Sequence, residues 1–326
     1  DLITFLLIQV SVKSGEGHAG VHHHDGFLNV NGIFDGRFDV ILTNPPFGAN
    51  VEPSDVVPEY DETAPANRAA EKRYKEDYGN LYTEAVATVR AAAGKPIASL
   101  FDLPKGEKSK IKTEILFIER CLTLLKPGGR LGIVLPEGIF NNPSLAYVRE
   151  FCENRAYIRA VVSLPQEAFY SSGASVKASL LFLQKFTAKE KADFDVKHAK
   201  ALAEVKETYA EAIHKETKRL EAAIVAANDA NNVKQRKGLQ KELKDYQNRM
   251  AVTIATETRA LLKKRFPYPI FLYKAEKVGI TATGDEDQNE LCRYPKDNPP
   301  PGIVKTCLEL HEEFRRNPEL FFITEE

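Results

Sequence analysis

The residues with the clearest potential for chemistry are Asn44, Pro45, Pro46 and Phe47, which directly follow the apolar run Asp39–Thr43. The side-chain oxygen of Asn44 and the carbonyl of Pro45 can both accept hydrogen bonds from one NH2 group. Two such bonds drive the nitrogen from planar towards tetrahedral geometry and free its lone pair to attack a methyl donor. The prolines fix φ and hold the carbonyl rigidly, while the Phe47 ring can stack on a planar ring. The pattern predicts modification of an amino group; the alternative is an ordinary proline-rich strand end with Asn44 as a turn residue.

These residues need a strand end to position them. Asp39–Thr43 is predicted to be a buried parallel strand, and open α/β sheets bind ligands at the carboxyl ends of their strands. Apolar runs and helical patterns alternate as far as residue 187, as in an α/β domain. The spacing predicts strands at Phe38–Thr43, Arg130–Leu135, Ile158–Leu164 and Ala178–Gln184, and helices at about 66–78, 81–93 and 112–125. The last helix is expected to end at Lys126–Gly129.

The composition of the 326 residues excludes several classes of protein. About two domains are expected at this length, and a hydrophobic content of 43% excludes a mainly disordered chain. The formal net charge of −1 excludes a basic field over the whole protein but leaves room for a local basic patch. The longest apolar run, Leu2–Val10, is too short to span a membrane, and four cysteines without CxxC pairing indicate reduced thiols. A cytoplasmic protein without a membrane partner is therefore expected.

Three regions differ in composition, and we expect a catalytic α/β domain at 1–187, a helical hairpin at 188–265 and a C-terminal extension at 266–326. The middle region is rich in Ala, Glu and Lys, and its apolar residues recur at the 3–4 spacing of a coiled-coil-like seam. Residues 228–232 and Gly238 mark the predicted turn. From Lys234 to Arg265 there are ten basic and three acidic residues, a net charge of +7. This charge is typical of a solvated helix face; the alternative is a surface for DNA or for a partner subunit.

The chain resembles a known family at several segments that occur in order. Asn44–Phe47 looks like the catalytic motif of amino-group methyltransferases that use S-adenosylmethionine (SAM). Its context is similar to the adenine-specific DNA methylases, above all the modification (M) subunits of type I restriction–modification systems. The other segments are 22–26, 125–130, 134–138, 163–170, Gly173, 179–183 and 266–284. The likeness covers about residues 15–187 and 266–290.

This resemblance implies a Rossmann-like SAM-dependent methyltransferase sheet, N-terminally incomplete, with an inserted antiparallel helical hairpin and a C-terminal extension. It implies site-specific transfer of a methyl group from SAM to the exocyclic amine of adenine in double-stranded DNA. Asn44 and Pro45 would polarise the amine, and Pro46 and Phe47 complete the motif. The family also works with a specificity subunit and a restriction subunit, which are therefore the expected partners.

A DNA adenine methylase flips its target base out of the duplex and stacks it between aromatic rings. Phe47 would contact one face of the base, and Phe169 or Tyr170 the other. The alternative for Phe169 and Tyr170 is core packing at a strand end. Asp25, at the end of the preceding predicted strand, would lie near the adenine of SAM. The run His22–His24 has no second ligand cluster, so no metal site is expected.

Gly15–Gly20 fits the pattern G-x-G-x-x-G, which a cofactor-binding loop also shows. Only 23 residues separate Gly20 from Asn44, too few for the α/β steps that lie between a glycine loop and the catalytic strand, at roughly 30 residues per βαβ unit. We therefore interpret this segment as a turn and expect the glycine loop N-terminal to Asp1.

It follows that residues 1–326 alone are expected to bind SAM weakly or not at all, and not to methylate DNA. A SAM site needs backbone amides from a glycine-rich turn and a carboxylate for the ribose hydroxyls. Calorimetry with SAM tests the expectation, and micromolar binding would show that Gly15–Gly17 or another segment completes the donor site.

Two other functions fit the same residues. The Asn-Pro-Pro-aromatic motif also serves methyltransferases that act on protein glutamine or on guanine in ribosomal RNA. The other possibility is a non-catalytic helical interaction protein with a vestigial methylase fold, which the intact motif at Asn44 disfavours.

Overall fold

The computed structural model describes residues 26–29, 33–59, 65–103, 110–172, 176–294, 302 and 305–322. Up to the end of the sheet's central strands, the elements are β1 (Phe38–Thr43), β2 (Asn50–Val51), α2 (Pro65–Tyr78), α3 (Asn80–Ala91), η1 (Ile97–Leu100), β3 (Ile111–Lys112), α4 (Thr113–Leu124), β4 (Leu125–Pro136), α5 (Gly138–Asn141), η2 (Pro143–Leu145), α6 (Ala146–Glu153), β5 (Ala156–Ser163), η3 (Gln166–Ser172) and β6 (Ala178–Lys185). They are followed by α7 (Ala188–Asp229), α8 (Val233–Arg265), β7 (Phe271–Lys274), β8 (Val278–Ile280), β9 (Glu286–Asn289), α9 (Cys307–Arg316) and η4 (Pro318–Phe321).

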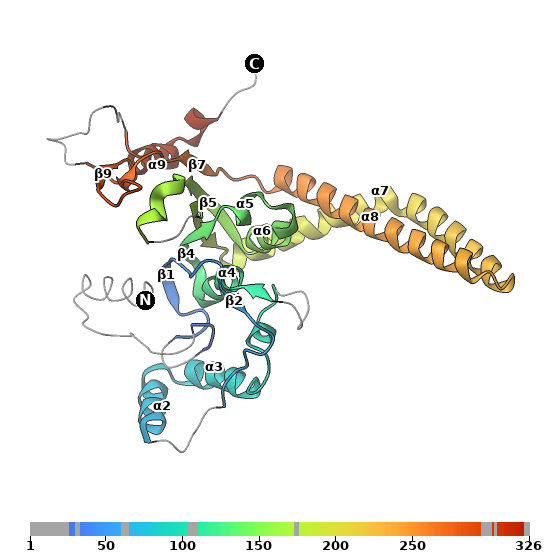
Figure 1. Ribbon diagram of the computed structural model, residues 1–326, viewed down its shortest axis with the longest axis horizontal. Coiled ribbons are helices and arrows are strands. Elements are labelled where there is room, and N and C mark those ends of the chain that lie inside the picture. Colours follow the sequence, from blue (N-terminus) through green and yellow to red (C-terminus); the bar gives the residue numbers. More distant parts are fainter. Residues whose placement is uncertain are drawn as a thin grey trace. The chain divides into compact units, whose positions relative to one another are not determined.

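The centre of the α/β part is a five-stranded mixed sheet of order β1-β4-β6-β5-β7 (Figure 1). β1 runs parallel to β4 and β7 runs parallel to β5, while β6 is antiparallel to both β4 and β5. Four strands of this sheet therefore point the same way, and their last residues, Thr43, Pro136, Ser163 and Lys274, lie at one edge, called the carboxyl edge below. The four strands and three helices predicted from the sequence are confirmed.

One face of the sheet is covered by α4 and α6 and forms the main core. Along β4, the alternate residues Leu131, Ile133 and Leu135 are buried, as the period of two of a strand requires. They pack with Leu116 and Ile118 of α4, which are fully buried. A second, smaller cluster on the other side of the sheet joins β5 and β7 to α9.

The prediction that Asp39–Thr43 is buried is wrong for the face of β1 that points away from the main core. Val40 and Leu42 are 49% and 54% exposed, whereas Ile41 packs against the main core. The reason is that β1 lies at the end of the strand order, and these two side chains line an open groove with Leu180 and Phe182 of β6. The parallel pairing of β1 with β4 is confirmed.

The chain divides into two compact units, one containing the sheet and the other formed by Ala188–Tyr268. The sheet unit includes the chain from Pro269 onward, because β7 pairs with β5. The C-terminal region thus contributes a strand to the same sheet as the residues before 188.

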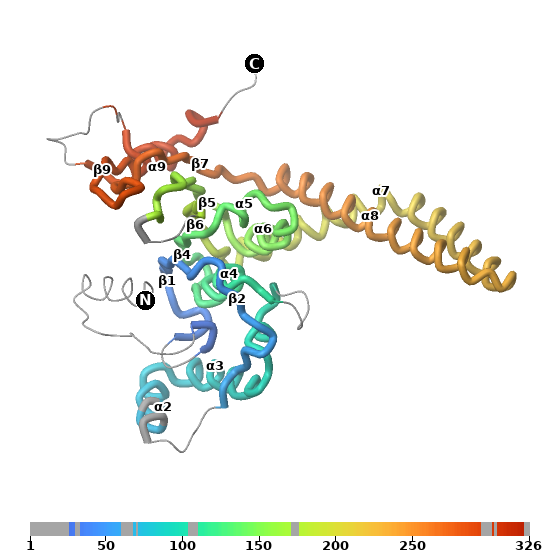
Figure 2. Tube along the Cα trace, in the orientation of Figure 1, coloured from blue at the N-terminus to red at the C-terminus, as the bar shows by residue number. Residues whose placement is uncertain are grey.

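The second unit is the helical hairpin of α7 and α8, whose traces lie side by side in Figure 2. Contacts between the helices include the hydrogen bond from the Tyr209 hydroxyl to Glu257 and the ion pair of Arg265 with Glu204 at 2.5 Å. The turn forms where predicted: Asn231 has a left-handed φ of 51°, and the Asn232 side chain accepts a hydrogen bond from the Gln235 N–H at 3.1 Å.

Gly238 was expected in the turn, but it lies inside α8. The asparagines already supply the left-handed residue and the N-cap, so the helix begins at Val233 and continues through the glycine. Among the helices in the described ranges, none is long and apolar enough to cross a membrane.

Candidate active site

The candidate site begins where β1 ends. Asn44 and Phe47 are half-buried, Pro45 is fully buried and Pro46 is exposed. Gly48, which follows, has a φ of +76°, a left-handed conformation that turns the chain away from the sheet and that glycine adopts without strain. The four residues of the motif therefore lie at the carboxyl edge, where an open α/β sheet binds ligands.

The side-chain oxygen of Asn44 is buried and has no hydrogen-bond partner among the described residues. An unsatisfied buried acceptor costs about 1–3 kcal/mol, so it indicates a position at which a donor from a ligand is missing. An amino group would supply that donor.

Phe47 lies beside Phe169 of η3, although 121 residues separate them in the sequence. Their ring centroids are 6.3 Å apart and the ring planes are inclined by 77°. A planar base stacked on one ring would therefore meet the edge of the other ring rather than a second parallel face. Tyr170, the other predicted stacking residue, is 39% exposed.

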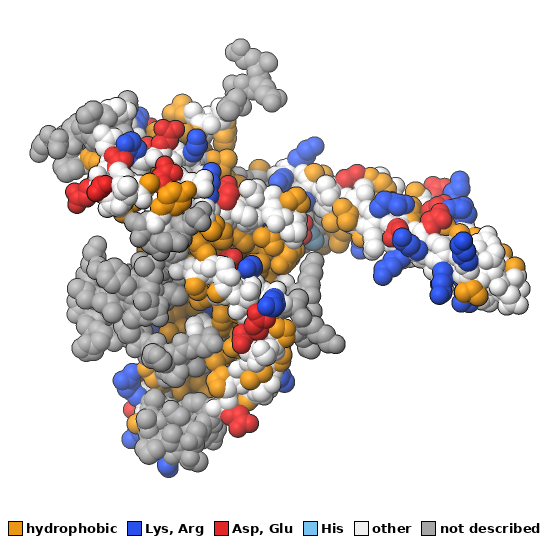
Figure 3. Space-filling view, in the orientation of Figure 1, with side chains coloured by type: hydrophobic (Ala, Val, Ile, Leu, Met, Phe, Trp, Pro, Cys, Tyr) orange, Lys and Arg blue, Asp and Glu red, His pale blue; other side chains and the backbone are white. Residues whose placement is uncertain are grey.

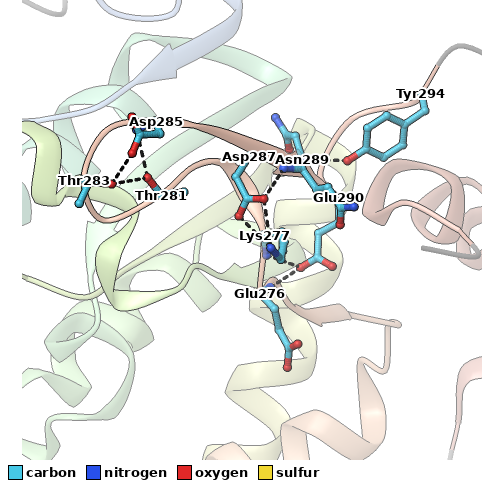
Figure 4. Close-up of polar contacts among 10 residues, drawn as sticks. Glu276, Lys277, Thr281, Thr283, Asp285, Asp287, Asn289, Glu290 and Tyr294 are labelled. Carbon is cyan, nitrogen blue, oxygen red and sulfur yellow. Dashed lines mark hydrogen bonds and ion pairs between the residues drawn. The ribbon is translucent and has the colours of Figure 1, made fainter. Parts of the chain in front are cut away.

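Phe169 is held by the second hydrophobic cluster, which contains Ala275, Val278 and Leu291 around the β8–β9 hairpin. The polar contacts of this hairpin are drawn in Figure 4. Lys277 pairs with Asp287 at 2.9 Å, and its backbone N–H donates to Glu290 at 3.1 Å. β7 ends at the carboxyl edge, so this hairpin follows directly from it and supports the segment that carries Phe169.

The remaining side of the motif is fastened to the start of α4. Glu114, only 5% exposed, accepts a hydrogen bond from the Gly48 N–H. The Thr113 N–H donates to the Ala49 carbonyl at 3.1 Å, and the Lys112 Nζ donates to the Gly48 carbonyl at 3.3 Å. The backbone that follows Phe47 is thus fixed by three consecutive residues.

Glu114 is a functional candidate that the sequence interpretation missed. Its Oε2 is buried without a partner among the described residues, and burial raises the pKa of its carboxyl, while the Gly48 N–H and the charge of Lys112 act in the opposite direction. The sequence of α4 could have indicated that Glu114 is buried. A helix with apolar residues on nearly all sides also buries its charged residues. In α4 these apolar residues are Ile115, Leu116, Ile118, Cys121 and Leu122.

The Glu114→Gln variant tests this burial through pH. Because the folded state raises the carboxyl pKa above 4.5, the ionised form costs stability, and this cost grows as the pH rises through the folded pKa. We expect the stability of the variant relative to the wild type to increase as the pH rises above 4.5, with about 2–4 °C in Tm for each kcal/mol. Scanning calorimetry measures it, with Glu59→Gln at an exposed position as the control. A difference in Tm that does not change with pH would contradict the assignment.

The other predicted site residue, Asp25, and the segments Gly15–Gly20 and His22–His24 lie outside the described residues. Of the predicted site residues, the structure therefore describes those predicted to hold the acceptor base: Asn44, Pro45, Pro46, Phe47, Phe169 and Tyr170.

The sheet, with four strands in one direction, one reversed strand and Asn-Pro-Pro-Phe at a carboxyl end, is a Rossmann-like methyltransferase fold. Residues 101–254 match the family model of the N-6 DNA methylases. The matched range begins after Asn44–Phe47, so the roles of these four residues stay predictions.

Among curated proteins, the chain is similar to the methylase subunits of two type I restriction enzymes: EcoKI from Escherichia coli K12 and StySJI from Salmonella typhimurium LT2. In both cases the identity is 29% over 98 residues, which is 30% of this chain. The matched region spans only 17% of the length of each relative.

Solved structures of low similarity include a class I SAM-dependent methyltransferase from Listeria monocytogenes, with 22% identity and a TM-score of 0.35 over 58% of this chain and 43% of that chain. Another is a modification subunit of a type I restriction enzyme from Vibrio vulnificus YJ016, with 21% identity and a TM-score of 0.34 over 56% of this chain and 30% of that chain.

Proposed function

We propose that this protein is a SAM-dependent methyltransferase that modifies the exocyclic amine of adenine in double-stranded DNA. The observation that carries the proposal is the buried, unpartnered side-chain oxygen of Asn44 at the carboxyl edge, beside the ring of Phe47. The match of residues 101–254 to the family model of the N-6 DNA methylases supports DNA over protein glutamine or ribosomal RNA as the substrate.

In this mechanism the chain's own residues prepare the amine. The Asn44 side-chain oxygen and the Pro45 carbonyl accept hydrogen bonds from the two N–H groups of the amine, which localises the lone pair on nitrogen. Phe47 stacks on the flipped base, which meets the edge of the Phe169 ring, and the two rings exclude water from the reacting nitrogen. SAM, when bound, supplies a methyl group on a sulfonium, and Asp25 is the residue proposed to lie near its adenine.

Partners follow from the relatives, which are subunits of type I restriction enzymes. We propose that the protein assembles in the cytoplasm with a specificity subunit, which selects the DNA sequence, and with a restriction subunit. The chain would then contribute the acceptor pocket rather than sequence recognition.

The test uses host cells that lack adenine methylation and express the gene encoding this chain, with and without the specificity and restriction subunits. The measurement is the base composition of their DNA. We expect N6-methyladenine by mass spectrometry, and its loss in the Asn44→Ala variant. If the methyl group were found on glutamine of a release factor or on guanine of ribosomal RNA, that molecule rather than DNA would be the substrate. Methylation that persists unchanged in the Asn44 variant would reject this site.

A further inference from the structure

The helical hairpin carries a basic surface that the proposed methyl transfer does not use. In Figure 3, Lys and Arg side chains predominate over Asp and Glu on the visible face of the part of the hairpin nearest its turn. Lys234, Lys237, Lys241 and Lys244 are all exposed, and none forms an ion pair with a carboxylate of the residues that the structure describes. Their spacing of three, four and three residues puts them on one side of α8.

The stripe of four lysines is positively charged overall because two of the three acids of α8 interact with α7. Glu242 forms an ion pair with Arg219 of α7 at 3.2 Å, and Glu257 accepts a hydrogen bond from the Tyr209 hydroxyl. Asp245, the third acid, is exposed next to Lys244. Counting Asp245 against the four lysines still leaves the stripe with a net positive charge.

The neighbours of the stripe are polar rather than apolar. Gly238, Asp245 and Asn248 lie on the same side of the helix, and the space where a Gly238 Cβ would sit has nothing within 4 Å. Cores of protein–protein interfaces are enriched in aromatic residues and depleted in Lys, so this composition disfavours a protein partner. A phosphate backbone, by contrast, binds exposed lysines as point charges and needs no apolar contact.

We propose that the stripe Lys234, Lys237, Lys241 and Lys244 binds the phosphate backbone of double-stranded DNA without reading its sequence. The four lysines span about 15 Å of helix at 1.5 Å per residue, which matches about four phosphates at 3.4 Å along one strand. The choice of DNA among polyanions rests on the proposed function, but the contact itself requires neither SAM nor Asn44.

The test is binding of a fluorescein-labelled 30-base-pair duplex to the whole chain, followed by anisotropy between about 50 and about 200 mM KCl. With all four lysines replaced by Gln, we expect at least a tenfold weaker affinity at low salt and a log–log salt slope reduced by about 3.6, since each of the four phosphate contacts contributes about 0.9. The matched control replaces Lys189, Lys200, Lys206 and Lys215, four exposed lysines of α7 that do not form a stripe. Circular dichroism verifies that both variants keep the helices.

An unchanged affinity and salt slope in the stripe variant would overturn the proposal, as would an equal loss in the control, which would indicate a general effect of charge. Loss of binding to a partner subunit with DNA binding intact would assign the stripe to protein assembly instead. Duplex binding separates the two proposals, because it is measured without SAM and requires no methyl transfer, so it can be observed even if the protein methylates another substrate.

Discussion

Replacing Asn44 with alanine is expected to lower methyl transfer by about 10²–10³-fold, the usual cost of losing one preorganised polar contact at a reacting centre. The variant should be at least as stable as the wild type. The Asn44 oxygen is buried without a partner among the described residues, so its removal eliminates an unsatisfied acceptor instead of breaking a hydrogen bond. Loss of activity together with retained stability is the expected behaviour of a residue placed for a substrate.

The measurements are single-turnover methylation of DNA by the full-length product of the gene that encodes this chain, since residues 1–326 alone are expected not to methylate DNA, and scanning calorimetry of the same preparation. Asn80→Ala, an exposed substitution at the start of α3, is the matched control and should change neither quantity. Turnover within threefold of the wild type, or a large drop in Tm, would contradict the assignment of Asn44 to the acceptor amine.

Of the substitutions considered, replacing Arg120 is expected to lower the free energy of unfolding most. This arginine of α4 is only 4% exposed, and its guanidinium donates to the carbonyls of Gly26 at 3.1 Å and Leu28 at 2.7 Å. It also donates to the Asn29 side chain at 2.6 Å and pairs with Asp35 at 3.2 Å. One side chain thus fastens the segment that leads into β1 to the helix behind the sheet.

The Arg120→Met variant keeps most of the volume but leaves two acceptors in buried residues, the Leu28 carbonyl and the Asn29 side-chain oxygen, without this donor, whereas Gly26 and Asp35 are exposed to water. Each buried acceptor that loses its donor costs about 1–3 kcal/mol, so the unfolding temperature of the sheet unit should fall in scanning calorimetry. Arg316→Met, at an exposed position on α9, should stay within about 0.5 kcal/mol. A loss below about 1 kcal/mol for Arg120→Met would show that the guanidinium contacts do not anchor this segment.

Local patterns predicted the elements of the sheet unit well. β1 and β6 were located to within one residue, and the helix of α4 ends before Pro127 as expected. Such features depend on residue period and on turn chemistry, which neighbouring residues determine. The turn of the hairpin is a similar case, because Asn231 and Asn232 carry both the left-handed conformation and the helix cap.

Features that depend on distant parts of the chain could not be predicted. The sequence left Phe169 and Tyr170 as equal candidates, and only the fold of η3 places Phe169 beside Phe47. The exposure of Val40 and Leu42 depends on which strand lies at the end of the sheet. Glu114 resembles an ordinary acidic residue of a first helical turn until its contact with Gly48 is known.

The insertion of the hairpin between β6 and β7 has a consequence for how the chain folds. Both strands pair with β5, from opposite sides. β6, which precedes residues 186–270, and β7, which follows them, are therefore two strand spacings apart, about 10 Å in the direction across the strands. Closing a flexible loop of that length has an entropic cost that each doubling of length raises by about 0.6 kcal/mol. The contacts of α7 and α8 are local in sequence and can form within microseconds. The hairpin is thus expected to fold first and to shorten the effective loop between β6 and β7. Mutations that unfold the hairpin would then slow the pairing of β7 with β5, although the hairpin contributes no strand to the sheet.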